Sequence, residues 1–102
     1  MVLEAEIKAL RDSGYIEGEL SVHPLWYILW EPENIAAYNK EYEVAEYAPG
    51  FTAFGSSGGN ELLVVNKTGE IFTIPAICME AQYAEKVASN FEALRPLMQR
   101  NK

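Results

Sequence analysis

The residues most suggestive of chemistry are the glycines and serines of "GSSGG", residues 55–59. A phosphate-binding loop needs a lysine after its glycines, and a dinucleotide-binding loop must open a helix. Here the acid Glu61 stands where a base is needed, and residues 61–65 predict a strand. We therefore interpret Gly55, Gly58 and Gly59 as backbone devices, which adopt positive φ or admit a close neighbour, and expect no cofactor.

The sequence has one histidine and one cysteine, His23 and Cys78, which are far apart in the chain. No pair of such residues has the spacing of metal ligands, so we expect no metal. His23 precedes Pro24 at the mouth of a predicted strand, where a surface histidine is common. Cys78 lies in the apolar run "AICME", so we expect a buried, inert thiol. The sequence therefore predicts no catalytic residue and no enzyme.

The acidic balance of the chain bears on its partners. The net charge is −7, and residues 12–66 carry a single base, Lys40, against nine acids: Asp12, Glu17, Glu19, Glu31, Glu33, Glu41, Glu43, Glu46 and Glu61. This balance argues against direct nucleic-acid binding, which needs Lys and Arg for phosphate contacts. It suits a basic protein partner, attracted by long-range steering, and it also suits simple solubility.

Glu41, Glu43 and Glu46 are close in sequence but lack the glycine turn of a calcium loop, so they predict a solvated acidic face. A single cysteine permits no internal disulfide, which favours a reducing, cytoplasmic location. No apolar run approaches the roughly 18 residues that cross a bilayer, so we expect no membrane association. The acids near the start of the chain argue against a signal peptide.

Apolar periodicity predicts the elements of the first half. Residues 3–11 form a helix with Leu3, Ile7 and Leu10 on one face, ended by Gly14. Residues 15–22 form an irregular or edge segment. Residues 24–30, "PLWYILW", predict a strand covered on both faces, with Trp26 and Trp30 packed in the core. A helix then opens at Pro32 and loses its pattern around Glu43.

The second half predicts strands at 51–54, 61–65 and 70–74 and a helix over 83–98. The last two strands form a hairpin with Gly69 in a left-handed turn position, and Pro75 ends the sheet. The final helix should turn Val87, Phe91 and Leu94 inward, with a break near Pro96. Consecutive strands imply antiparallel pairing. We therefore predict an α+β fold: a single domain over 1–102, with a central, mostly antiparallel sheet of about four to six strands and flanking helices.

The stretch "ILWEPENIAAYNKEYEVAEYAPGFTAFGSSGGNELLVVNKTGEIFTIP" resembles the SUKH superfamily, which contains the Smi/Knr-type cell-wall-synthesis regulators of yeast and many bacterial toxin-immunity proteins. The resemblance covers about residues 13–98. It rests on the order of an "LW" strand end, a helix, a proline, the "FGSSGG" segment, two strands with "IP", and a closing helix. The residues that match are Trp30, Asn39, Tyr42, Pro49, Phe54, Gly55, Gly58, Gly59 and Phe91.

Two departures from the family pattern affect the surface. In the family, an acid usually follows the double glycine directly. Here Asn60 lies between Gly59 and the acid Glu61. Only about twelve residues precede "DSGYIEGE", fewer than the family usually has. A covering helix would then be missing, which leaves apolar surface for a partner or for a second copy of the chain in a homodimer.

The resemblance implies binding rather than catalysis. Family members in toxin systems bind and block a cognate toxin, often a nuclease with a basic surface. We therefore expect an immunity protein with a basic protein partner; the alternatives are a regulatory or scaffold protein without a toxin, and an enzyme in which His23, Cys78 and a carboxylate converge. The candidate partner contacts, taken from charge and expected exposure, are Glu41, Glu43, Glu46, Tyr47, Asn60 and Glu61.

Overall fold

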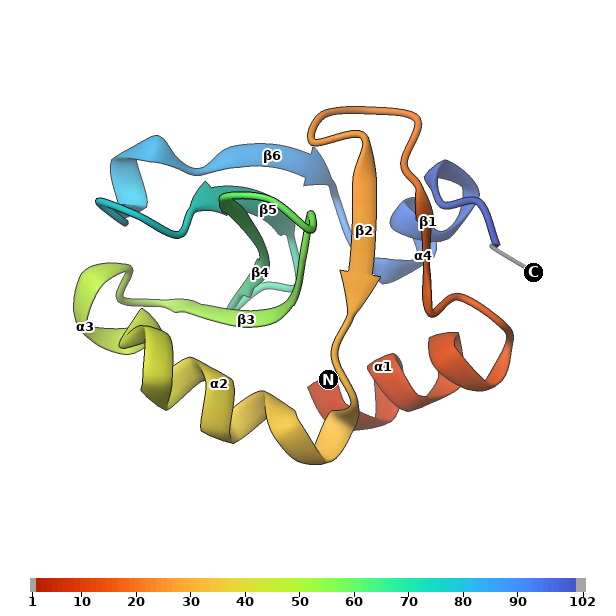
Figure 1. The fold of residues 1–102 in the computed structure, drawn as a ribbon, viewed down its shortest axis with the longest axis horizontal. Helices are drawn as coiled ribbons and strands as arrows, with labels where there is room; N and C mark the ends of the chain where they lie inside the picture. The colour runs from red at the N-terminus through yellow and green to blue at the C-terminus, as the bar shows by residue number, and fades with distance from the viewer. Residues whose placement is uncertain (1, 101–102) are drawn as a thin grey trace.

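The protein is an α+β domain built on one curled antiparallel sheet, as the sequence predicts (Figure 1). The computed structural model describes residues 2–100. Six strands follow one another in the sheet in chain order: β1 (Glu17–Glu19), β2 (Trp26–Leu29), β3 (Phe51–Ser56), β4 (Glu61–Asn66), β5 (Ile71–Pro75) and β6 (Glu85–Ala88). Every neighbouring pair is antiparallel.

The helices are short. They are α1 (Leu3–Asp12), α2 (Ile35–Tyr42) after a 3-10 turn at Pro32–Asn34, α3 (Val44–Tyr47) and α4 (Phe91–Leu94), with further 3-10 turns at Ala81–Tyr83 and Arg95–Leu97. Helix α1 precedes the strands, α2 and α3 join β2 to β3, and α4 follows β6. Figure 1 shows α1 and α2 along one side of the curled sheet and α4 behind β1. The left-handed Gly14 and Gly69, with φ of 99° and 89°, end α1 and form the β4–β5 turn as expected.

Each face of the sheet has its own core. The larger core joins Ile7 and Leu10 of α1 and Phe91 and Leu94 of α4 to one face of the strands. The smaller core packs α3 and the segment after β5 on the other face, through Val44, Ala48, Ala53, Leu62, Val64, Ile74 and Met79. Because both faces are covered, β4 is a run of four buried residues, Leu62 to Val65, rather than an alternating strand.

Three sequence-based expectations are wrong. The predicted helix over 83–98 begins with a strand, β6, and only Phe91–Leu94 are α-helical. The side chain of Asn90 accepts a hydrogen bond from Ala93 N at 2.7 Å, so the helix starts there and not earlier. Cys78 is exposed, not buried. On β2 the buried residues are Tyr27 and Leu29, and Trp26 is only half-buried. Trp30, which follows the strand, is also half-buried but packs against both cores, as predicted.

Candidate functional site

The side chain of Asn39 fixes α2 against the sheet. β2 pairs with β3 only at Gly55 and Ser56, so the backbone of Ala53 lies beyond the end of β2. Asn39 takes that place: its Nδ2 donates to Ala53 O and its Oδ1 accepts from Ala53 N, both at 2.8 Å. Nδ2 also donates to Ile35 O at 2.8 Å. The amide thereby ties the backbone of α2 to β3.

Trp30 supports the aromatic residues of the same helix. Its ring lies parallel to Tyr42, with centroids 6.1 Å apart and 3° between the planes, and meets the edge of Tyr38 at 4.9 Å. Trp30 contacts both cores. Tyr42 is therefore held in one orientation although 42% of it is exposed.

A left-handed residue separates α2 from α3. Glu43 has φ 55° and ψ 43°, and the chain turns there so that Val44 and Ala48 become buried. Four of the predicted contact residues remain exposed together on this turn: Glu41, Glu43, Glu46 and Tyr47. We call these four residues and Tyr42 the α2–α3 face. Hydrogen bonding and repulsion from Glu46 raise the pKa of Glu43, which marks a surface crowded with negative charge.

A groove runs between this face and the segment that follows β5. It has a volume of about 600 Å³ and is lined by Tyr42, Tyr47, Ala76, Cys78, Met79 and Glu80. Figure 1 shows α3 and that segment at the same end of the sheet. The segment carries two further exposed apolar side chains, Ile77 and Tyr83. Aromatic walls with an acidic rim suit a partner that presents apolar and basic side chains.

The glycine-rich stretch is split between a strand and a turn. Gly55 lies within β3, where a Cβ would collide with the carbonyl oxygen of Ile28 on β2. Gly58 takes φ 79° in the turn to β4, whereas Gly59 does not need a positive φ. The hydroxyl of Ser56, at the end of β3, accepts from Gly58 N, and that of Ser57 accepts from Gly59 N. Both backbone roles expected of the glycines are thus confirmed, one at Gly55 and one at Gly58.

The remaining motif residues shape the core and the approach to β3. Phe54 is fully buried and meets Phe91 of α4 edge to face, with ring centroids 5.1 Å apart. Pro49 is exposed in the link between α3 and β3. Asn60 is exposed in the turn before β4, and its carbonyl accepts from Ala76 N at 2.7 Å, beside the groove.

Glu61 points away from the other predicted contacts. It is half-buried and lies beside His23, with His23 Nε2 at 2.9 Å from its Oε2. Glu85 Oε2 lies 3.6 Å from the same nitrogen. These three side chains come from the β1–β2 loop and the starts of β4 and β6. The sequence did not predict this group, because only the curl of the sheet brings the three segments together.

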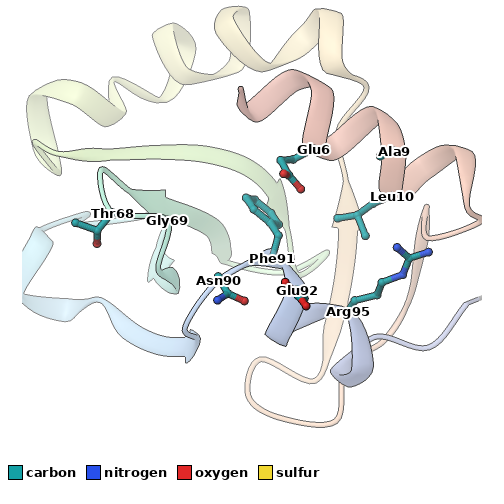
Figure 2. A pocket seen from close by; sticks show the side chains of 9 residues that line it. All are labelled: Glu6, Ala9, Leu10, Thr68, Gly69, Asn90, Phe91, Glu92 and Arg95. Atoms are coloured by element: carbon teal, nitrogen blue, oxygen red, sulfur yellow. The ribbon is translucent and has the colours of Figure 1, made fainter. Parts of the chain in front are cut away.

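A second cavity lies between α1, the β4–β5 turn and α4 (Figure 2). Its volume is about 490 Å³, and Leu10 and Phe91 of the larger core form its floor. Figure 2 shows the chargeable side chains, Glu6, Glu92 and Arg95, spread around the opening rather than converging on one point. Asn90 is occupied in capping α4. The three chargeable side chains of the lining therefore form no close cluster in this view.

Comparison with known proteins finds no matching family model and no similar curated sequence. Among residues 2–100, no helix has the length and apolar character to span a membrane.

Proposed function

We propose that this chain is a non-catalytic protein-binding module and that the α2–α3 face, with the groove beside it, is its partner surface. One observation carries the proposal: two exposed tyrosines, Tyr42 and Tyr47, line a groove of about 600 Å³ together with Glu80, and the exposed acids Glu43 and Glu46 adjoin them in the chain. Tyrosines that are held rigidly lose little entropy on binding, so they make efficient anchors.

The charge of the face selects the class of partner. Four acids, Glu41, Glu43, Glu46 and Glu80, lie on exposed positions of this region against one base, Lys40. Such a surface accelerates association with a basic protein and disfavours an acidic one. We infer a basic protein as the occupant.

We further propose that the partner is a toxin and that the chain is an immunity protein of the cytoplasm. The resemblance to the SUKH superfamily supports this role, since the matched residues Trp30, Asn39 and Tyr42 are those that build and support the α2–α3 face. A nuclease toxin would present the basic surface that the acidic face requires.

The test uses the product of the gene next to that of this protein. The two proteins are co-expressed, and cell survival and association kinetics are measured at low and at high salt. We expect this protein to restore growth and to bind in a salt-sensitive way. Reversing the charge of Glu41, Glu43 and Glu46 to lysine should slow association by about tenfold or more at low salt. Replacing Tyr47 with alanine should instead speed dissociation by about tenfold.

A matched triple reversal at Glu17, Glu19 and Glu92, which are also exposed, provides the control. It changes the net charge equally but leaves the α2–α3 face intact. Equal slowing by both triple variants would refute the proposed surface. Neighbouring genes that encode no toxin, or a toxin that this protein neither binds nor blocks, would refute the immunity role and favour a regulatory one.

A further inference from the structure

We propose that His23, Glu61 and Glu85 form a binding site for one Zn²⁺ ion. Each of the three offers one ligand atom, and these atoms all lie within 4.8 Å of one another. Imidazole nitrogen and carboxylate oxygen are both normal zinc ligands, and three protein ligands leave the fourth position to water. The site has no part in the α2–α3 face and adds a ligand to what is proposed above.

The fold places two of the ligands on one face of the sheet. Glu61 precedes Leu63 by two residues on β4, so its side chain shares the face of the larger core. Thr73 of β5 stands opposite Glu85 of β6 in the register. The two carboxylates thus lie at the rim of the concave face, and the β1–β2 loop carries His23 over them. The loop passes beside β6 in Figure 1.

A buried hydroxyl orients one of the carboxylates. Thr73 is only 1% exposed, and its Oγ1 donates to Glu61 Oε1 at 2.9 Å. Both oxygens of Glu61 lie close to His23 Nε2, Oε2 at 2.9 Å and Oε1 at 3.2 Å. Outer hydrogen bonds of this kind fix ligand orientation in metal sites and raise affinity. Glu61 is accordingly the least exposed of the three ligands, at 25% for its side chain.

The distances suit a small divalent ion. Ligands about 2.0 Å from a tetrahedral zinc are about 3.3 Å apart. His23 Nε2 lies 2.9 Å from Glu61 Oε2 and 3.6 Å from Glu85 Oε2, on either side of that value. Small side-chain rotations therefore admit the ion, which takes the place of any proton on Nε2.

The negative charge of Glu61 and Glu85 also favours binding of a cation. Two carboxylates face one imidazole, and the ion pairs of residues 2–100 give neither carboxylate a lysine or arginine. The neighbouring base, Lys86, is paired with Glu70 at 2.9 Å. A divalent ion neutralises both carboxylates. Calcium and magnesium prefer oxygen-only sites with more ligands, so the single imidazole favours zinc over either.

The experiment titrates the tag-free full chain with ZnCl₂, and with MgCl₂ and CaCl₂ for comparison, by calorimetry, thermal unfolding and NMR. His23 is the only histidine, so its ring gives one set of imidazole signals. We expect one zinc per chain, a shift of those signals and a rise in Tm on the order of 5 °C. Hydrogen exchange of residues 21–25 should slow, because the ion ties their loop to β4 and β6.

Variants separate this site from other zinc ligands. Glu85→Gln, at an exposed position, should weaken binding about tenfold or more without unfolding the protein, and His23→Gln should do the same. Thr73→Val should weaken it by about tenfold through the orientation of Glu61. Glu80→Gln and Cys78→Ser should bind as the parent does. Zinc binding that survives Glu85→Gln and His23→Gln, that disappears in Cys78→Ser, or that magnesium matches would overturn the assignment.

Discussion

Replacing Asn39 with alanine should destabilise the protein far more than a surface asparagine would. The change removes two hydrogen bonds of 2.8 Å to the backbone of Ala53, which is fully buried. The third bond, to Ile35 O, matters less, since that carbonyl also belongs to the helical ladder of α2. Both the N–H and the carbonyl of Ala53 then lose a hydrogen-bond partner while buried, and each unpaired buried backbone group costs about 1–3 kcal/mol.

For the two groups together, the expected loss is therefore about 2–6 kcal/mol in the free energy of unfolding. A domain of this size loses roughly 4–8 °C of Tm per kcal/mol, so the loss should be obvious in a thermal scan. Urea unfolding followed by circular dichroism gives the free energy itself. Asn34→Ala is the matched control, because Asn34 precedes the same helix and its side chain makes no capping hydrogen bond. A loss in Asn39→Ala within about 0.5 kcal/mol of that in Asn34→Ala would refute the reasoning.

Asn39→Asp extends the same test to pH. One carboxylate oxygen can still accept from Ala53 N, but the other faces the carbonyls of Ala53 and Ile35. Repulsion there would raise the folded-state pKa of the new carboxyl above its unfolded value. The variant should then be least stable above that raised pKa and recover as the pH falls through it, because the protonated group donates again. A stability deficit that is constant from pH 7 to pH 4 would contradict this account.

Two further predictions concern β3 and the β4–β5 turn. Gly55→Ala should lower the free energy of unfolding by about 1–3 kcal/mol, because the new Cβ meets the backbone of β2. Gly59→Ala should change it little, since the site has room for a Cβ. Equal urea midpoints for the two variants would contradict this. Hydrogen bonds from Lys86 and from the turn hold the pKa of Glu70 at about 2, so its stabilising contribution is complete above about pH 4.5 and is lost as the pH falls toward 2. In Lys86→Gln, an NMR titration should show the pKa of Glu70 higher; an unchanged value would rule out the ion pair as its cause.

Local patterns predicted the elements that depend on local interactions. The face of α1 formed by Ile7 and Leu10 and the left-handed turn at Gly69 follow from spacing and from the backbone freedom of glycine. The prediction of the last helix was wrong because tertiary pairing overrides the local preference there. Glu85, Lys86 and Ala88 favour a helix in isolation, but pairing with β5 makes them a strand. Asn90, a strong N-cap type, was the available signal that the helix begins later.

The candidate sites also differ in how far the sequence could predict them. The exposed acids of α2–α3 could be predicted because charge density and a helix end are visible in the sequence. The groove beside them could not be predicted, because it depends on the course of the chain after β5 and on the exposure of Cys78. The group at His23 needs the curvature of the whole sheet, and no spacing in the sequence encodes that.

The C-terminal segment completes one edge of the sheet. Ser21 N donates to Leu97 O, Gln99 N donates to Glu19 O, and Leu20 forms a bridge with Met98. The five pairs within the sheet join strands that follow one another in the chain, so these pairs can form in the order of synthesis. The outer edge of β1 has to wait until residues 97–99 have been synthesised. During that interval the nascent protein carries an open strand edge, which the short length of β1 and the charges of Glu17 and Glu19 protect against pairing with other chains.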